Sequence, residues 1–562
     1  MSTRAAHRRL LRRSRLIAAL AVLTMVVSCG QATSTSDSRT ALVAMVQEPG
    51  LLNPFFNDQS GSDISYAFTI EQLFQARPDG SYEPNLAAEI PTVENGAIRD
   101  GGKVVTYRLR EGITWSDGEP FTADDLAFTV GVYQHPKSVA LVEPDYALVD
   151  SVKVVDELTA EVRMTEPNPG YLNLFRQVLP KHEFDSTAVS LSHPQARLPL
   201  GTGPFVYTSW RTGDRITLVR NPHYWRDPEL PRLDGVTIKV TPDKQATMSA
   251  FANGESDTVY FFSGDDLVDL TAARERRLPV SVRTDGEHTG SVEWLWLNHS
   301  ARGNPHKAHP ILGDPAVREA IDVAIDRRAL VDGVLSGFGE LSGSLVYAGF
   351  GAEQTRPARY DQRRADALLD AAGWRRGDDG VRVKDGVRAS MKFQTITGDQ
   401  TRVLYQQLIQ HNLEQVGIEL KIQNVPSNTM FGAYADGGLL ATGNYDIMMS
   451  RAGADYPEPG PWVQTFVGSE IPTEKNPNGF TYAHWRNARF DRLAAEVTST
   501  IDQDERRRLF GEMNTLFARE RVALPLYGTV RGWAWNSRLE NMSTDYWEGF
   551  WTTSSTARWS VD

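Results

Sequence analysis

The sequence predicts an α/β protein, and three observations lead to that class. The chain has 562 residues, several times the roughly 150 residues of a typical domain. Hydrophobic residues make up 41% and charged residues 23%, which is the composition of a folded globular chain. Strand-like and helix-like segments alternate along it, as they do in α/β domains. The net charge of −12 argues against a general nucleic-acid binder.

Residues 1–28 have the features of a bacterial signal peptide. They contain six arginines and no acidic residue, followed by an apolar run of 12 residues from Leu16 to Val27. That run is too short to cross a bilayer and has the length of a signal-peptide core. Arginine pairs at Arg8-Arg9 and Arg12-Arg13 leave both the general secretory route and the twin-arginine route open.

The segment Val26-Val27-Ser28-Cys29-Gly30 resembles a bacterial lipobox, and Cys29 is the single cysteine of the chain. A lone thiol forms no internal disulfide, and its place after the apolar run fits a diacylglyceryl anchor. An incidental cysteine in an ordinary secretory signal is the alternative. We expect residues 29–37 to be a lipid-anchored linker, and the protein to be held at the outer face of the bacterial cytoplasmic membrane.

Without residues 1–28 the chain keeps 53 basic and 71 acidic residues, a net charge of −18. Anionic lipid would repel such a domain, so the lipid has to provide the anchoring.

Two segments read as half-buried strands because apolar and polar residues alternate in them. They are 216–220 (ITLVR) and 236–240 (VTIKV). A third strand is expected at 418–422 (IELKI), directly after a helix that ends at Gly417.

Four segments of the second half predict helices, because apolar residues recur at helical spacing between capping residues and glycines. The first opens at Asp314-Pro315, and the others cover about 361–372, 402–416 and 505–517. Gly373 ends the second of them.

The signatures of common enzymes are missing. Gly101-Gly102-Lys103 lacks the upstream glycine and the following hydroxyl residue of a phosphate-binding loop, and neither H-E-x-x-H nor G-x-S-x-G occurs. His299, His306 and His309 lie in a Gly/Pro-containing segment that we expect to be a solvated loop and not a metal site. We therefore expect no catalytic residue, no metal and no cofactor. A pair of carboxylates for glycoside chemistry stays open, because 71 acidic residues offer many pairs.

Several short motifs follow one another along most of the chain. They are 86–89 (LAAE), 106–112 (TYRLREG), 115–126 (WSDGEPFTADDL), 179–182 (LPKH), 201–205 (GTGPF), 221–225 (NPHYW), 296–298 (WLN), 314–318 (DPAVR), 324–327 (AIDR) and 368–374 (LLDAAGW). In this order they resemble the extracellular solute-binding proteins, family 5, which include the oligopeptide- and dipeptide-binding lipoproteins of bacterial ABC importers. We expect these motifs to supply turns, helix caps and core aromatics, not ligand contacts.

The resemblance implies a two-lobed, periplasmic-binding-protein-like fold (type II, cluster C) with an additional domain and a ligand cleft between the lobes. The implied domains are domain I at 38–77, 196–288 and 523–562, domain II at 78–195, and domain III at 289–522.

The resemblance also implies a ligand site near Tyr445-Asp446-Ile447 and the segment 454–459 (ADYPEP). In peptide binders of this type the aspartate matching Asp455 pairs with the α-ammonium of the ligand. A buried ammonium needs such a carboxylate, since an unpaired buried charge is costly. A turn cap before Pro457 is the alternative role. The family often has tryptophan where this chain has Ala452, so one wall of the first side-chain pocket is expected to be wider.

Three further residues are candidates for this ligand site. Tyr456 and Trp462 are candidate pocket walls, although aromatics near a cleft are as often core residues. Arg451 could meet an acidic side chain or the carboxylate terminus of a ligand, or lie on the surface.

The function implied is that of a binding lipoprotein, not an enzyme, that captures short peptides and delivers them to an ABC permease and its ATPase. We expect a monomer that binds no nucleic acid. Another solute (an oligosaccharide, an opine or a metal complex), an exported hydrolase, and a surface sensor or adhesin are the alternatives.

Overall fold

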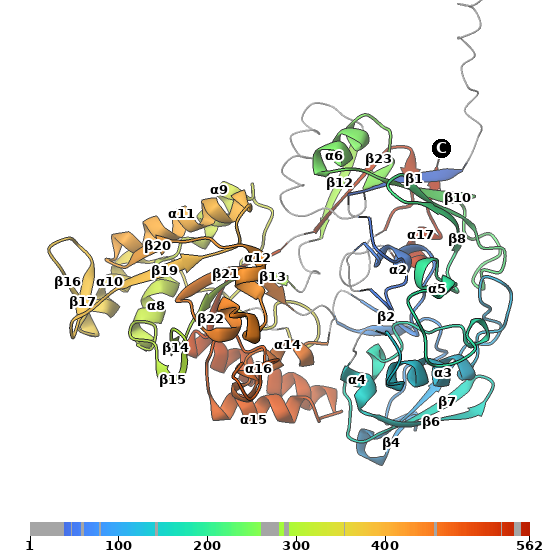
Figure 1. Ribbon diagram of the computed structural model, residues 1–562, viewed down its shortest axis with the longest axis horizontal. Coiled ribbons are helices and arrows are strands. Elements are labelled where there is room, and N and C mark those ends of the chain that lie inside the picture. The colour runs from blue at the N-terminus through green and yellow to red at the C-terminus, as the bar shows by residue number, and fades with distance from the viewer. Residues whose placement is uncertain are drawn as a thin grey trace, which may run out of the picture.

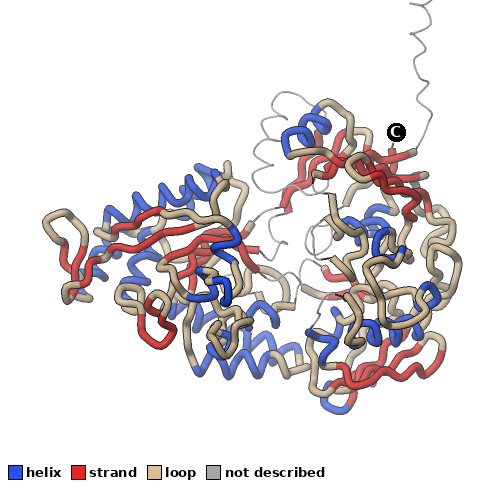
Figure 2. The backbone as a smooth tube through the Cα atoms, in the orientation of Figure 1, coloured by secondary structure: helices blue, strands red, loops and turns tan. Residues whose placement is uncertain are grey.

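The chain forms two lobes that lie side by side (Figures 1 and 2). The computed structural model describes residues 39–46, 48–57, 61–77, 80–140, 144–259, 280–285, 291–352, 355–453, 458–529, 531–543 and 552–561. We call the described residues within 39–285 and 531–561 the first lobe, and those within 291–529 the second lobe. The chain passes between the lobes twice, once after residue 285 and once after residue 529.

A seven-stranded mixed sheet forms the base of the first lobe, in the order β12-β23-β11-β1-β10-β9-β8. β1 runs parallel to β10 and β11, and the other pairs are antiparallel. The strands are β1 Thr40–Met45, β8 Phe205–Arg211, β9 Arg215–Arg220, β10 Gly235–Val240, β11 Thr258–Val259, β12 Val280–Asp285 and β23 Arg531–Asn536. Neighbouring strands therefore come from opposite ends of the sequence, which makes this lobe discontinuous.

A smaller unit of the first lobe is built on a four-stranded antiparallel sheet with the order β4-β5-β7-β6. Its strands are β4 Ile98–Arg99, β5 Val104–Arg108, β6 Val149–Asp156 and β7 Thr159–Met164. The helix α3, Ala123–Gln134, begins with a capping box in which Thr122 and Asp125 satisfy each other's backbone amides. This unit, at the lower right of Figure 1, has its own hydrophobic core.

The second lobe is built on a five-stranded sheet with the order β20-β19-β21-β13-β22. Its strands are β13 Ser291–Leu297, β19 Ser390–Gln394, β20 Glu419–Ile422, β21 Ile447–Gly453 and β22 Ala523–Gly528. Side chains alternate along β13, so that Trp294 and Trp296 enter one core and Leu295 and Leu297 enter another. Helices therefore cover both faces of this sheet (Figure 1).

The strands and helices expected from periodicity and capping are present. The strands 216–220, 236–240 and 418–422 correspond to β9, β10 and β20. The expected helices are α8 Pro315–Ala324, α10 Gln362–Ala371, α11 Gln400–Gln415 and α16 Gln503–Glu520. Asp314 and Asp361 cap α8 and α10 with side-chain hydrogen bonds. Gly373 and Gly417 follow α10 and α11 at φ +86° and +81°, a conformation that favours glycine.

The remaining elements are short. The helices are α2 Ile64–Phe68, α4 Pro144–Ala147, α5 Pro194–Arg197, α6 Lys244–Ala252, α9 Arg327–Val334, α12 Ser427–Phe431, α13 Leu439–Thr442, α14 Gly460–Gln464, α15 Ala488–Val497 and α17 Thr553–Thr556. The strands are β2 Phe74–Ala76, β3 Tyr82–Pro84, β14 Ser300–Ala301, β15 Asn304–Ala308, β16 Arg375–Arg376, β17 Arg382–Lys384, β18 Val387–Arg388, β24 Leu539–Glu540 and β25 Ser560–Val561.

The expectation of a solvated segment holds for His306, which is exposed, and is wrong for His309. Residues 300–308 form the β14–β15 hairpin, and His309 is buried, with Nε2 3.0 Å from Oδ1 of Asp446. The Nδ1 atom of His309 accepts the backbone amides of Ile311 and Leu312, so the ring fixes the turn before α8. Burial lowers the pKa of His299 to about 3, which keeps that ring neutral.

Residues 1–38, including Cys29, lie outside the described residues, so the signal peptide and the lipid anchor stay predictions. The domain boundaries stay a prediction. No helix in the described part of the chain is long and apolar enough to cross a membrane.

Candidate functional site

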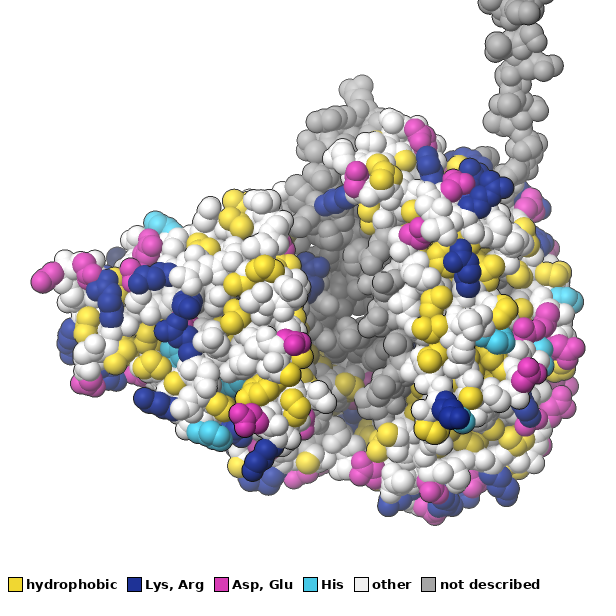
Figure 3. Space-filling model, in the orientation of Figure 1, with side chains coloured by type: hydrophobic (Ala, Val, Ile, Leu, Met, Phe, Trp, Pro, Cys, Tyr) yellow, Lys and Arg dark blue, Asp and Glu magenta, His cyan; other side chains and the backbone are white. Residues whose placement is uncertain are grey.

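A cavity of about 440 Å³ lies between the two lobes, as found in the described part of the chain. Its size is within the range of about 300–1,000 Å³ typical of small-molecule sites. The first lobe contributes Tyr66 and residues between 133 and 177, and the second lobe contributes residues between 458 and 506. Figure 3 shows the surface hollowed between the lobes. A molecule in this cavity would contact both lobes at once.

The second-lobe wall carries a buried ion pair. Nη2 of Arg506 lies 2.5 Å from Oε1 of Glu458, and Arg506 is only 1% exposed. The guanidinium also lies 4.9 Å from the ring centroid of Phe350. Glu458 accepts the backbone amide of Gly460 as well, which fixes the start of α14. Because its two charges neutralise each other, this pair shapes the wall without adding net charge.

Two residues that line the first-lobe wall each have a buried polar atom with no hydrogen-bond partner among the described residues. Asn168 is 4% exposed, and its Oδ1 accepts the amide of Gly170 at 2.8 Å, whereas Nδ2 has no partner. Gln177 donates through Nε2 to the hydroxyl of Tyr66, and its Oε1 has no partner. A buried polar group left unpaired costs about 1–3 kcal/mol. Both atoms are covered by neighbouring protein atoms, so they reach a ligand only if their side chains turn toward the cavity.

Aromatic rings and carboxylates complete the first-lobe wall. Tyr133 and Tyr146 stack with centroids 3.8 Å apart, and the guanidinium of Arg176 lies 5.5 Å from the ring centroid of Tyr66. Asp145 and Glu166 also line the cavity. Together with Glu458, the lining carboxylates outnumber the two lining arginines, which suits a ligand with a positively charged group.

The two main residues expected at the ligand site, Asp455 and Tyr456, lie outside the described residues, since 454–457 is not described. The flanking residues are informative. β21 ends at Gly453, and Glu458, the first described residue after the gap, lines the cavity. Asp455 as the amine partner thus stays a prediction.

The structure places Trp462 in the core of the second lobe. Its side chain is 7% exposed, Nε1 donates to the carbonyl of Leu345 at 2.8 Å, and the ring packs against Trp294 and Phe466. Its helix neighbours Pro461 and Gln464 line the cavity, so Trp462 supports the helix that forms the wall.

Arg451 lies on β21 beside a buried carboxylate. Its side chain is 44% exposed, and Nε is 3.9 Å from Oε2 of Glu293. Arg402 binds the same carboxylate with two hydrogen bonds of 2.7 and 3.2 Å. Burial alone would lower the pKa of Arg402, but the negative charge of Glu293 raises it above its usual value. Glu293 is held mainly by Arg402, which leaves Arg451 the looser of the two guanidinium groups.

The sequence motifs meet at a buried carboxylate, not at the cavity. Glu71 accepts hydrogen bonds from Thr202 in GTGPF at 3.1 Å, Trp225 in NPHYW at 2.6 Å and Thr553 at 3.0 Å. Burial raises the pKa of Glu71. A Cβ on Gly201 would lie 1.8 Å from the carbonyl oxygen of Thr69, so this packing requires glycine. In GTGPF and NPHYW these residues hold the fold together, as expected, while the absence of ligand contacts from the motifs stays a prediction.

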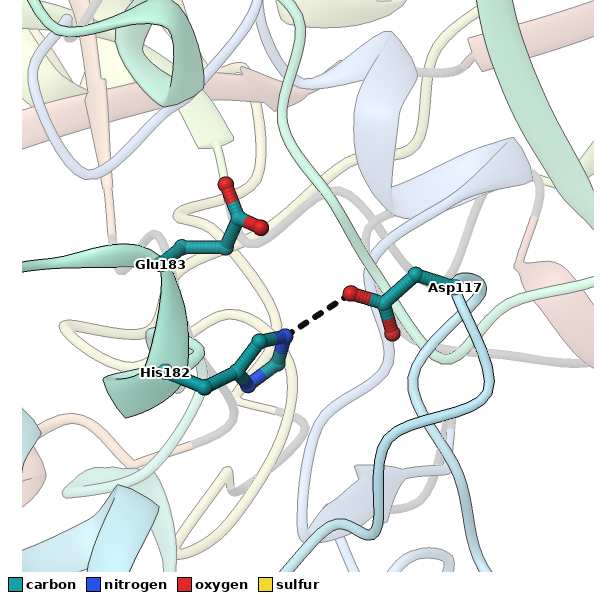
Figure 4. Close-up of side chains that lie close together, drawn as sticks. All are labelled: Asp117, His182 and Glu183. Carbon is teal, nitrogen blue, oxygen red and sulfur yellow. Dashed lines mark hydrogen bonds and ion pairs between the residues drawn. The ribbon is translucent and has the colours of Figure 1, made fainter.

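One exposed group in the described residues brings three possible metal-ligand atoms within 4.8 Å of one another: Asp117, His182 and Glu183 (Figure 4). Nε2 of His182 lies 2.8 Å from Oδ2 of Asp117. Glu183 accepts from Gln195 at 3.0 Å. Because each side chain has a protein partner at the surface, we interpret the group as a contact between the WSDG turn (115–118) and the LPKH segment (179–182).

Sequence reasoning missed Asn168, Gln177, Glu458 and Arg506 as cavity-lining residues. Glu458 belongs to the segment 454–459 (ADYPEP), which the resemblance had placed near the ligand site, and this position was the one signal for it in the sequence. The other three belong to no motif.

Comparisons with known proteins agree with this architecture. The family model "Bacterial extracellular solute-binding proteins, family 5 Middle" matches residues 81–473. The chain is 24% identical over 513 residues to the oligopeptide-binding protein AppA of Bacillus subtilis, covering 86% of this chain and 85% of that protein. It is 26% identical over 491 residues to the nickel-binding periplasmic protein of Escherichia coli, covering 85% and 86%.

Solved structures show the same fold. AppA of Bacillus subtilis in complex with a nonapeptide superposes with a TM-score of 0.68 at 22% identity, covering 93% of this chain and 99% of that one. NikA of Brucella suis in complex with Fe(III)-EDTA gives a TM-score of 0.73 at 21% identity, covering 93% and 100%. The predicted two-lobed α/β class of periplasmic binding proteins is confirmed. The chain belongs to the bacterial extracellular solute-binding proteins, family 5.

Proposed function

We propose that the protein is the substrate-binding lipoprotein of an ABC importer, and that it captures short peptides between its lobes and delivers them to the permease. The observation that carries this proposal is the cavity between the lobes, whose lining includes the side-chain amides of Asn168 and Gln177. Every peptide group offers a carbonyl acceptor and an N–H donor, so a peptide can satisfy both whatever its side chains.

The carboxylates around the cavity support a ligand with a free amine. Asp145 and Glu166 line the wall in addition to the neutralised Glu458–Arg506 pair, and Asp455 precedes Glu458 by three residues in the sequence. A charge-assisted hydrogen bond from an α-ammonium would fix where the peptide starts. The peptide leaves unaltered, since binding and release require no covalent step.

A metal complex is the second candidate, because a nickel-binding periplasmic protein is among the relatives. Imidazole and thiolate are the side chains that hold nickel best. The described residues that line the cavity include neither histidine nor cysteine. This favours the peptide over the metal complex.

Attachment to the membrane through Cys29 is part of the proposal. Each buried acyl CH₂ contributes about 0.8 kcal/mol, so two or three chains anchor firmly. Replacing Cys29 by serine should move the protein from the membrane fraction to the soluble fraction of the producing cells. Retention of Cys29→Ser in the membrane fraction would count against the anchor.

Native mass spectrometry of the purified protein tests the ligand class. We expect adducts that dissociate on denaturation into molecules with the masses and fragment ions of peptides. A released metal chelate or oligosaccharide would contradict the proposal. Incubation with a peptide mixture, followed by chromatography, tests the hydrolase alternative, because newly formed cleavage products would exclude a pure binding protein.

A further inference from the structure

One side chain of the second lobe is inserted into the edge of the first lobe. Ile501 lies between α15 and α16 and packs against the hydrophobic core of the four-stranded unit. In Figure 1 this end of the second lobe lies beside β4 and α4. The contact joins segments that are far apart in the sequence, so it belongs to the interface between the lobes.

The site that receives Ile501 depends on a glycine. Gly102 lies between β4 and β5 with φ +92°, and a Cβ built on it would lie 2.4 Å from Cγ1 of Ile501. The same Cβ would be 3.3 Å from Cβ of Pro167. Carbon atoms in contact are about 3.5–4.0 Å apart, so any side chain at position 102 would push Ile501 out.

The adjacent glycine offers a natural comparison. Gly101 also has positive φ, +64°, but nothing lies within 4 Å of a Cβ built on it. Substitution at either glycine strains the backbone, whereas only substitution at Gly102 reaches the other lobe.

This contact borders the cavity. Glu166, the neighbour of Pro167, and Thr498, three residues before Ile501, both line it. A second contact lies elsewhere along the interface, where Ala76 packs against the core of the second lobe and a Cβ on Gly80 would lie 2.4 Å from the amide nitrogen of Phe350. The first lobe thus contacts the second lobe at two places.

We propose that Ile501, received by Gly102 and Pro167, is a positioning contact that stabilises the described arrangement of the lobes, taken as the closed one, and thereby sets the affinity of the cavity. The inference rests on the proposed function, in that the cavity is taken as the ligand site. Ile501 is outside the cavity lining and acts through the position of the walls. If the contact is lost, a smaller fraction of the molecules is closed, and the apparent dissociation constant rises by the same factor.

The test compares four variants: Gly102→Ala, Gly101→Ala, Ile501→Ala, and Gly102→Ala combined with Ile501→Ala. All variants are made in a Cys29→Ser background, which contains no cysteine. Spin labels are attached through Val93→Cys on the first lobe and Leu404→Cys on the second, positions that are 59% and 51% exposed. The interlobe distance is measured by pulsed electron paramagnetic resonance with and without trialanine, and trialanine affinity by calorimetry.

Gly102→Ala should lengthen the interlobe distance and weaken trialanine binding about tenfold relative to Gly101→Ala. Ile501→Ala should also lengthen the distance, and adding it to Gly102→Ala should cause little further change, because both substitutions remove the same contact. If Gly102→Ala and Gly101→Ala give the same distances in both conditions, the inference is wrong. If trialanine binds to none of the proteins, including the background, the proposed function is contradicted, while the distances still decide whether the contact positions the lobes.

Discussion

Two buried regions of the first lobe, around Glu71 and around Asn168, differ in whether the polar atoms of that residue have hydrogen-bond partners. The carboxylate of Glu71 is buried and has donors from Thr202, Trp225 and Thr553. The wall of the cavity contains Asn168, also buried, whose Nδ2 has no partner. The acceptor atoms of Glu71 are thus satisfied within the fold, whereas Asn168 keeps one polar atom that a ligand could pair if the side chain turns toward it. The family motifs include Thr202 and Trp225, which bind Glu71, whereas Asn168 lies outside every motif.

The largest effect is expected where the polar groups are satisfied. Glu71→Ala would leave three buried donors without their acceptor, and we expect the free energy of unfolding to fall by about 3–5 kcal/mol. Urea denaturation measures this change. The exposed Glu119→Ala should change it by less than about 0.5 kcal/mol. If Glu71→Ala lowers the free energy of unfolding no more than Glu119→Ala does, the buried hydrogen bonds of Glu71 do not stabilise the fold.

The same carboxylate predicts a pH dependence. Burial raises the pKa of Glu71 above its ordinary value of 4.5, so the folded state holds this proton more tightly than the unfolded state. As pH rises from about 4.5 through the folded pKa, stability is therefore lost. Relative to Glu71→Gln, the wild type should become less stable across that window. A stability difference that stays constant with pH would show that Glu71 does not titrate in this way.

At the cavity wall the effect should fall on binding. Asn168→Asp keeps the oxygen that accepts the Gly170 amide and replaces the unpartnered donor by an acceptor. We expect trialanine affinity to fall about tenfold, the loss of one hydrogen bond of about 1.4 kcal/mol, with a smaller change in unfolding free energy.

A matched variant controls for the added charge. Asn444 is exposed and lies outside the cavity lining, so Asn444→Asp should leave affinity unchanged. Equal losses of affinity in Asn168→Asp and Asn444→Asp would mean that the donor of Asn168 does not contact the peptide.

The sequence predicted local structure well because local structure depends on neighbouring residues. Asp314 as a cap and Gly417 as a stop each act within one turn of a helix. His309 was misjudged because its burial depends on Asp446, 137 residues further along the chain. The same limit applies to Trp462, since an aromatic that lines a cleft and one that fills a core have the same local pattern.

The contacts between the lobes could not be predicted either, because they too join residues that are far apart in the sequence. Gly102 was noticed only as part of an incomplete phosphate-binding loop, and its contact with Ile501 exists only once both lobes are folded. Gln177 is polar in a segment with no motif, and its unpartnered oxygen is a property of the packed wall.

The most direct test of the central claim is a calorimetric titration of trialanine and N-acetyl-trialanine into the wild type and Asp455→Asn. If a carboxylate in the cleft receives the amine of a short peptide, the wild type should bind the free peptide about 10- to 100-fold more tightly than the acetylated one. The variant should lose most of that preference. Equal affinities of the wild type for both peptides, or an undiminished preference in Asp455→Asn, would contradict the account.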